Sequence, residues 1–168
     1  MKKFSWWKLI VGFLFYLFFH QLYDWMPNTL GAILGESIGS VYAHMEMLFY
    51  SYLTVSIIDY FRNRKEINLE KFIYARMLIL ASVPWMMIIV YYAVEALGIT
   101  LPHVMAIIWG IITTLIGLYF SIRLEEPFEN MPLSGSVKGM IILAFLTALI
   151  TYVGFSFEAP DNFFSANH

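Results

Sequence analysis

The chain has 168 residues, of which 60% are hydrophobic, 18% aromatic and only 13% charged, and its mean hydropathy is +0.70. This composition excludes an ordinary soluble globular domain and indicates a membrane protein. Ten Lys and Arg against twelve Asp and Glu give a formal charge of -2, so the basic surplus typical of nucleic-acid binding is missing. Because the chain has no cysteine, disulfides and Cys-ligated metal centres are excluded, and any metal ion must use His, Asp or Glu.

Five segments each contain about 20 mainly apolar residues, the length that a helix needs to cross a bilayer core. They cover roughly residues 6–23, 41–61, 72–96, 103–123 and 137–157. The first segment is not expected to be a signal peptide, because no small-x-small cleavage site follows it. We therefore expect an all-α protein, a single domain over residues 1–168 that forms a bundle of five transmembrane helices.

The basic residues indicate how this bundle is oriented. All ten Lys and Arg lie on one side of the predicted arrangement, and such residues are enriched in cytoplasmic loops. We expect a protein of the cytoplasmic membrane with its N-terminus inside and its C-terminal tail outside. Charged side chains at the inner helix ends are expected to be solvated. They are Asp59, Arg62, Arg123, Glu125 and Glu126.

Side chains from several spans are predicted to form one polar layer near the outer boundary of the membrane. A rise of 1.5 Å per residue places His20, His44 and His103 about 18, 27 and 30 Å from the basic residue at the inner end of each span. His20 and Asp24 are four residues apart and share a helix face. Because consecutive antiparallel helices pack side by side, His44 should lie next to this pair.

The connection between the first two spans, residues 28–40, is predicted to be an interfacial or re-entrant segment. Asn28 is expected to cap a short helix there. From Gly31, glycines recur at every fourth position and provide a surface for close backbone contact. In this arrangement the segment folds Glu36 and Ser37 back over the polar layer.

Ionisable groups at membrane depth are costly, so a cluster of them is treated as a functional site. The residue types suit Zn²⁺ or another divalent metal, with His20, Asp24 and His44 as ligands and His103 as a reserve ligand. Glu36 is expected to be a fourth ligand or the general base for a bound water. With Ser37, it would form the catalytic part of a hydrolytic site for a lipid-like substrate that enters from the outer leaflet.

Three alternatives remain open on the sequence. Ser37 or Ser40 with His44 and Asp24 could catalyse without metal, although no nucleophile elbow is recognisable. The polar layer could instead be structural, in a non-enzymatic accessory subunit or a small-molecule-binding protein that works as an oligomer or with a partner subunit. Transport would need a pathway through the monomer, and no charged residue is expected at the bilayer midplane.

Within the spans, two polar or irregular features are expected to be structural. Pro84 should kink the third span or leave a carbonyl unpaired. Thr113 and Thr114 in the fourth span are expected to bond to their own backbone.

Three runs of residues resemble a family of small prokaryotic polytopic membrane proteins of uncharacterised function. The runs are residues 20–24 (H-Q-L-Y-D), 35–37 (G-E-S) and 44–49 (H-M-E-M-L-F), and the family pattern is H-x-x-Y-[DE] followed by N-E-S-x6-H-[LM]-x-L-L-F. The chain departs from it at Gly35, where the family has Asn, and at Tyr42-Ala43, where it has Trp-Glu. The resemblance implies a polytopic membrane fold and no reaction. It also implies a shared motif at His20, Asp24, Glu36, Ser37 and His44.

Overall fold

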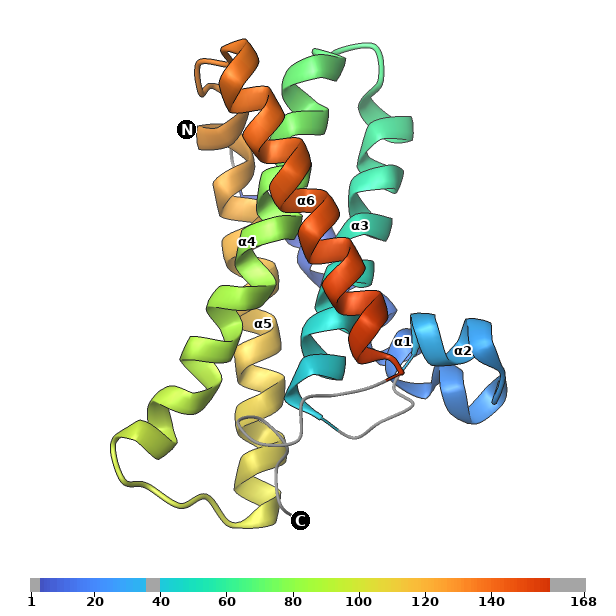
Figure 1. Ribbon diagram of the computed structural model, residues 1–168, viewed down its shortest axis with the longest axis vertical. Helices are drawn as coiled ribbons and strands as arrows, with labels where there is room; N and C mark the ends of the chain where they lie inside the picture. The colour runs from blue at the N-terminus through green and yellow to red at the C-terminus, as the bar shows by residue number, and fades with distance from the viewer. Residues whose placement is uncertain (1–3, 36–39, 158–168) are drawn as a thin grey trace.

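The structure, a computed structural model, describes residues 4–35 and 40–157. In these residues it is all-helical, as predicted, and Figure 1 shows the long helices running side by side with one short helix at the edge. The helices are α1 (Trp6–Trp25), α2 (Thr29–Leu34), α3 (Val41–Asn63), α4 (Leu69–Ala96), α5 (His103–Glu129) and α6 (Gly135–Phe155). The five long helices coincide closely with the five apolar segments predicted from the sequence.

Local signals in the sequence explain where the helices begin and end. Asn28, Ser40, Asn68 and Ser134 each accept a hydrogen bond from a backbone N–H in the first turn of the next helix. Such caps satisfy N–H groups that lack a partner inside the helix. After α4, Gly98 adopts a positive φ of 75°, a conformation that favours glycine and stops the helix. The predicted cap at Asn28 is therefore confirmed.

Three of the helices, α4, α5 and α6, are long and apolar enough to cross a membrane. The helices α1 and α3 have comparable lengths but carry more polar and aromatic residues. More than half of the residues of α3 are buried, because this helix packs against α1, α4, α5 and α6. Its buried serines are satisfied within the helix; Ser51 and Ser56, for example, donate to the carbonyls of Met47 and Tyr52.

The short helix α2 folds back against the end of α1. A Cβ atom on Gly31 would lie 1.8 Å from the carbonyl oxygen of Met26, and one on Gly35 would lie 2.8 Å from the backbone nitrogen of Tyr23. No side chain fits at either distance, so both positions need glycine. This confirms the predicted close backbone contact at Gly31 and Gly35, whereas residues 36–39 lie outside the described part of the chain.

Halfway along the bundle, side chains of α3, α4 and α5 pack directly against two glycines, one on α1 and one on α5. A Cβ atom on Gly117 would lie 2.7 Å from Leu48 and 2.9 Å from Met87, and one on Gly12 would lie 3.0 Å from Leu118. We call these five residues the central layer. It separates the bundle into two halves with different polar contents.

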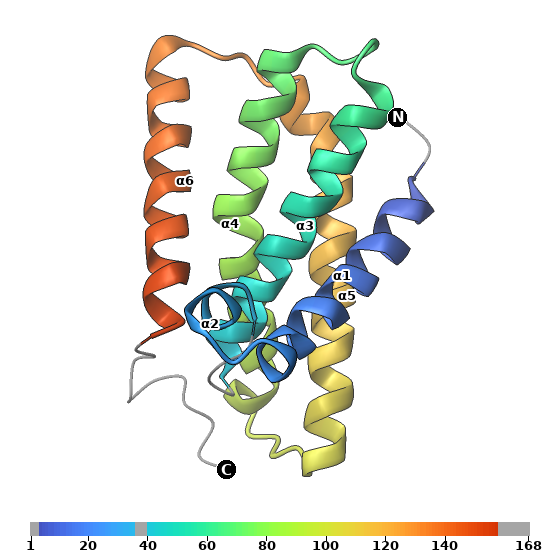
Figure 2. The same cartoon turned by 90° about the vertical axis from the view of Figure 1, so that its right-hand side faces the viewer.

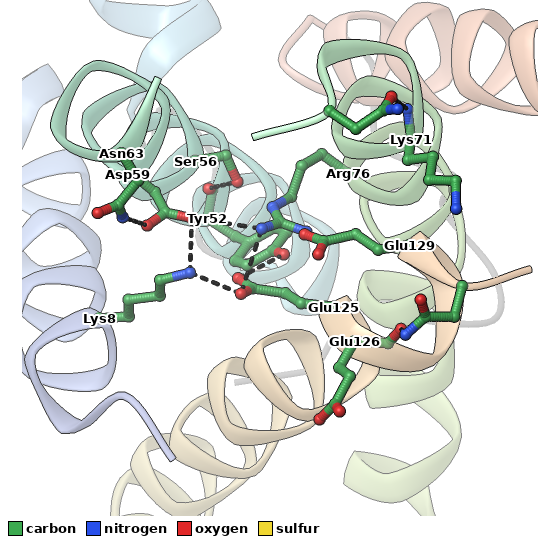
Figure 3. A network of polar contacts seen from close by, with 12 residues as sticks. Lys8, Tyr52, Ser56, Asp59, Asn63, Lys71, Arg76, Glu125, Glu126 and Glu129 are labelled. Carbon is green, nitrogen blue, oxygen red and sulfur yellow. Dashed lines mark hydrogen bonds and ion pairs between the residues drawn. The ribbon is translucent and has the colours of Figure 1, made fainter. Parts of the chain in front are cut away.

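One half contains a buried ionic network, shown in Figure 3. Lys8 of α1 lies 2.6 Å from both Asp59 of α3 and Glu125 of α5. Arg76 of α4 lies 3.3 Å from Asp59, 3.2 Å from Glu125 and 3.0 Å from Glu129. Lys8, Asp59 and Arg76 are only 6%, 4% and 5% exposed. Four helices are thus joined by charges from which water is largely excluded.

Neighbouring polar groups complete this network. The hydroxyl of Tyr52 donates to Glu125 at 3.1 Å, and the side-chain amide of Asn63 donates to Asp59 at 2.9 Å. The guanidinium of Arg76 also lies over the ring of Phe72, 4.3 Å from its centroid. Buried ions of opposite charge are tolerated when additional bonds of this kind satisfy their other donors and acceptors. One donor of the network, Nε of Arg76, is buried without a hydrogen-bond partner in the part of the chain that the structure describes.

The network corrects one expectation from the sequence. Asp59 and Glu125 are not solvated helix ends, because Lys8 and Arg76 reach them inside the bundle. Arg62 and Arg123 are exposed, as expected, and Figure 3 shows Glu126 directed away from the network. We call this end of the molecule, with the α3–α4 and α5–α6 connections, the network end, and the opposite end the pocket end.

We expect Arg76→Gln to lower the free energy of unfolding by about 3–5 kcal/mol, since Asp59 and Glu125 would then share the single ammonium of Lys8 and Glu129 would lose its partner in the network. The measurement is a denaturant titration in mixed micelles. Lys138→Gln is the control, because Lys138 pairs with Glu70 at the exposed surface of the same end. It should leave the midpoint nearly unchanged. Equal midpoints for the two variants would contradict a stabilising role of the network.

Candidate functional site

The other half of the bundle contains a cavity of about 480 Å³ between α1, α3, α4 and α5. We call it the histidine cavity, because three of the four histidines of the chain line it. Its lining consists of Tyr16, Leu17, His20, Ser40, Val41, His44, Met45, Leu48, Met87, Ile88, Tyr91, His103, Ala106, Ile107, Gly110, Ile111, Thr113 and Thr114. Leu48 and Met87 of the central layer close it on the side toward the network end.

The polar part of the cavity is a cluster of aromatic rings from α1 and α3. The ring centroids of His20 and His44 lie 5.7 Å apart. The ring of Tyr16 stacks with His20 at 6.3 Å and meets His44 edge-on at 6.4 Å. The predicted juxtaposition of His20 and His44 is therefore confirmed. His103 reaches the same cavity from the first turn of α5, where it is exposed.

One hydrogen bond fixes the orientation of His44. Its Nδ1 lies 3.0 Å from the backbone carbonyl oxygen of Ser40. A carbonyl oxygen can only accept, so Nδ1 of His44 donates this hydrogen bond. The hydroxyl of Ser40 caps the same helix by accepting from the N–H of Ala43 at 3.2 Å. Ser40 thus both starts α3 and positions the imidazole.

The rest of the cavity is mainly apolar, and it opens to the surface between α1 and α5. Three exposed apolar residues, Leu17, Ile107 and Ile111, belong to the lining at this opening. Figure 2 shows that α1 is tilted relative to α5. The opening is therefore apolar, while the histidines lie toward the pocket end.

Two adjacent threonines of α5 line the cavity and differ in their hydrogen bonds. The hydroxyl of Thr114 donates to the carbonyl of Gly110 at 2.9 Å, as expected from the sequence. The hydroxyl of Thr113 is buried without a hydrogen-bond partner among residues 4–35 and 40–157. A buried hydroxyl without a partner is costly, so it is a natural contact for a bound molecule.

The structure brings together only part of the predicted metal site. Asp24 is exposed near the end of α1 and does not line the cavity, while Glu36 and Ser37 lie outside the described residues. Glu46 also does not line the cavity, and it accepts a hydrogen bond at 2.8 Å from Ser156, which caps the C-terminus of α6. Within the described ranges, no group of three or more His, Cys, Asp or Glu side chains is arranged to hold a metal ion.

The sequence did not reveal the contribution of α4 to the site. Met87, Ile88 and Tyr91 line the cavity, yet in the sequence they are ordinary members of an apolar span. A Thr-Thr pair in the apolar fourth span was the available signal for the deep end of the cavity. The pair alone did not indicate which hydroxyl bonds to the backbone.

The chain matches no protein-family model, and no curated protein or solved structure is significantly similar to it. The resemblance of its motifs to the uncharacterised membrane family therefore stays an expectation. The candidate site has to be interpreted from its own geometry.

The two threonines provide a matched pair of substitutions. Thr113→Val should leave the apo protein equally stable or stabilise it by up to about 1 kcal/mol, because it removes a buried hydroxyl without a partner. Thr114→Val should destabilise it by about 1 kcal/mol, because a hydrogen bond is lost. Thermal unfolding in mild detergent measures both. A larger loss in Thr113→Val than in Thr114→Val would show that the Thr113 hydroxyl has a structural partner.

Proposed function

We propose that the protein is an integral membrane protein that binds an amphipathic, lipid-like small molecule in the histidine cavity. The observation that carries this proposal is the cavity itself, which is polar at the histidines and apolar elsewhere. Its volume of about 480 Å³ falls in the range of small-molecule sites. The expectation of a small-molecule-binding membrane protein is thus the interpretation that the geometry favours.

The apolar opening supports entry from the membrane. Leu17, Ile107 and Ile111 are exposed there, and apolar side chains at the surface of a transmembrane bundle contact lipid tails. An amphiphile in the bilayer can reach the cavity through this opening without crossing water. Its hydrocarbon part would replace lipid contacts with contacts to similar side chains.

The composition of the lining defines the polar group of the ligand. Imidazoles and hydroxyls offer hydrogen bonds, and none of the described lining residues is Lys or Arg. A strongly anionic head group would lack a fixed positive charge to pair with. We therefore propose an uncharged polar head group, such as a hydroxyl, amide or ester, held near His20 and His44.

We further propose that all five long helices cross the membrane, with the N-terminus in the cytoplasm. The support is that the described basic residues gather at the network end, consistent with the enrichment of Lys and Arg on the cytoplasmic side. The aromatic and polar residues of α1 and α3 are compatible with spans that pack mainly against other helices. The histidine cavity would then open in the outer half of the membrane.

Filling the cavity should abolish binding. Gly110 lines the cavity, and Gly139 lies on the exposed surface of α6; a Cβ atom on either one meets no atom within 4 Å. Gly110→Trp should therefore remove co-purified amphiphile, whereas Gly139→Trp should retain it. Native mass spectrometry of protein released from detergent measures the bound mass. Retention of the same molecule by the Gly110 variant would place the binding site elsewhere.

A divalent metal ion at His20 and His44 is a second candidate. A hydrogen bond from one ring nitrogen to a backbone carbonyl, as in His44, is typical of metal-ligating histidines. The centroid separation of 5.7 Å is also compatible with two imidazoles on one tetrahedral Zn²⁺. A further ligand would have to complete the site; Glu36, the predicted fourth ligand, lies outside the described residues, and hydrolysis with Glu36 and Ser37 would depend on that metal.

The metal content distinguishes this candidate from simple ligand binding. Tag-free protein purified without chelator should contain near-stoichiometric zinc if the candidate is correct, and His20→Ala and His44→Ala should both lose it. His103→Ala tests whether the third histidine is a ligand. Elemental mass spectrometry provides the measurement, with melting temperatures to verify folding. Metal-free, well-folded wild-type protein after incubation with zinc would rule out the metal site.

A further inference from the structure

The histidine cavity and the ionic network are built on the same four helices. Lys8 and His20 lie on α1, and Asp59 and His44 lie on α3. In the same way, α4 carries Arg76 and the cavity residue Tyr91, and α5 carries Glu125 and Thr113. No described residue of α6 contributes to either feature. A movement of these four helices relative to one another would therefore affect both ends together.

The barrier between the two features is thin. Along α5, Thr114 of the cavity and Ser121 are seven residues apart, which corresponds to about 10 Å of helix. Ser121 is 2% exposed and lies one helical turn before Glu125. Between them lies the central layer, in which two glycines and a methionine pack with Leu48 and Leu118. Glycine surfaces and flexible Met side chains can accommodate a change in helix contact more easily than interlocked branched side chains.

A proline in α4 also lies between the two features. The helix α4 continues through Pro84, which follows Arg76 by eight residues and precedes Met87 by three. Proline cannot donate a backbone hydrogen bond, so the helix is locally easier to bend. Bending at this point would move the part of α4 that carries Arg76 relative to the part that lines the cavity, without unfolding the helix.

We propose that the ionic network is a gate, and that the protein carries its small molecule across the membrane. In the structure the ionic network closes one end, and at the pocket end His103 both lines the cavity and is exposed. Separating Lys8 and Arg76 from their carboxylates would open the network end, where water can solvate the released charges and so offset the lost ion pairs. Closing the cavity at the pocket end would accompany this change. The absence of midplane charges, which argued against an ion pathway, does not argue against a carrier for an uncharged molecule.

Cysteine labelling tests this proposal directly, because the chain contains no native cysteine. Gly110→Cys reports on the cavity, and Ser121→Cys, a nearly isosteric change, reports on the space behind the gate. Each variant is labelled in oriented vesicles with a charged, membrane-impermeant methanethiosulfonate reagent added to one side at a time. In the otherwise unchanged protein, Gly110→Cys should react from the pocket end and Ser121→Cys from neither side.

The gate is then weakened with Glu125→Gln, which keeps the size of the side chain but removes its charge. The rate for Ser121→Cys from the network end should rise at least about tenfold, and the rate for Gly110→Cys from the pocket end should fall. Glu70→Gln, which removes an exposed ion pair with Lys138 at the same end, should change neither rate. Rates that stay unchanged, or that both rise, would overturn the proposal, because a structural network would loosen both regions or neither.

A milder variant covers the case in which Glu125→Gln does not fold. Tyr52→Phe removes one hydrogen bond to Glu125 and retains all charges. As with Glu125→Gln, the labelling rate of Ser121→Cys should rise and that of Gly110→Cys should fall, each by a smaller factor. Unchanged rates would overturn the proposed gate. This inference rests on the cavity of the proposed function, but the labelling needs no ligand. If the two labelling rates change in opposite directions in a protein that binds no amphiphile, the proposed ligand binding is refuted but the proposed gate is not.

Discussion

The pairing of charges inside the network end is the constraint on which the arrangement of the bundle depends. Lys8 and Arg76 are each within ion-pair distance of both Asp59 and Glu125, so the positions of α1, α3, α4 and α5 are fixed together. A buried ion that lost its partner would be strongly destabilising. The ends of these helices therefore cannot shift independently. Because the same four helices line the cavity, the network also constrains the shape of the cavity.

Much of the fold follows from short-range patterns that the sequence displays directly. Apolar length predicts the five long helices, the side chain of Asn28 predicts the start of α2, and antiparallel packing predicts that His44 meets His20. Each of these depends on neighbouring residues or on adjacent helices. Length and apolar composition suit α4, α5 and α6 to crossing a membrane, whereas the polar and aromatic residues of α1 and α3 also suit helices buried against other helices.

The ionic network and the composition of the cavity depend on contacts between distant segments. Lys8 and Glu125 are 117 residues apart in sequence, and nothing local indicates that they meet. In the sequence, Lys8 and Arg76 are interpreted only as basic residues that indicate the orientation of the helices. Their role as ion-pair partners of Asp59 and Glu125 is therefore not predicted. Asp24 is a different case. Its four-residue spacing predicts that it lies near His20, but spacing alone does not predict whether its side chain lines the cavity.

The double role of Ser40 links the stability of a helix end to the chemistry of the cavity. Its hydroxyl accepts a hydrogen bond from the backbone N–H of Ala43, and its carbonyl oxygen accepts one from the ring of His44. The first turn of α3 therefore determines both the helix cap and the orientation of the imidazole. Fraying of this turn would free the imidazole to rotate and to exchange its tautomer. Backbone amide exchange at the start of α3 is thus a sensor of the state of His44, readable without any ligand.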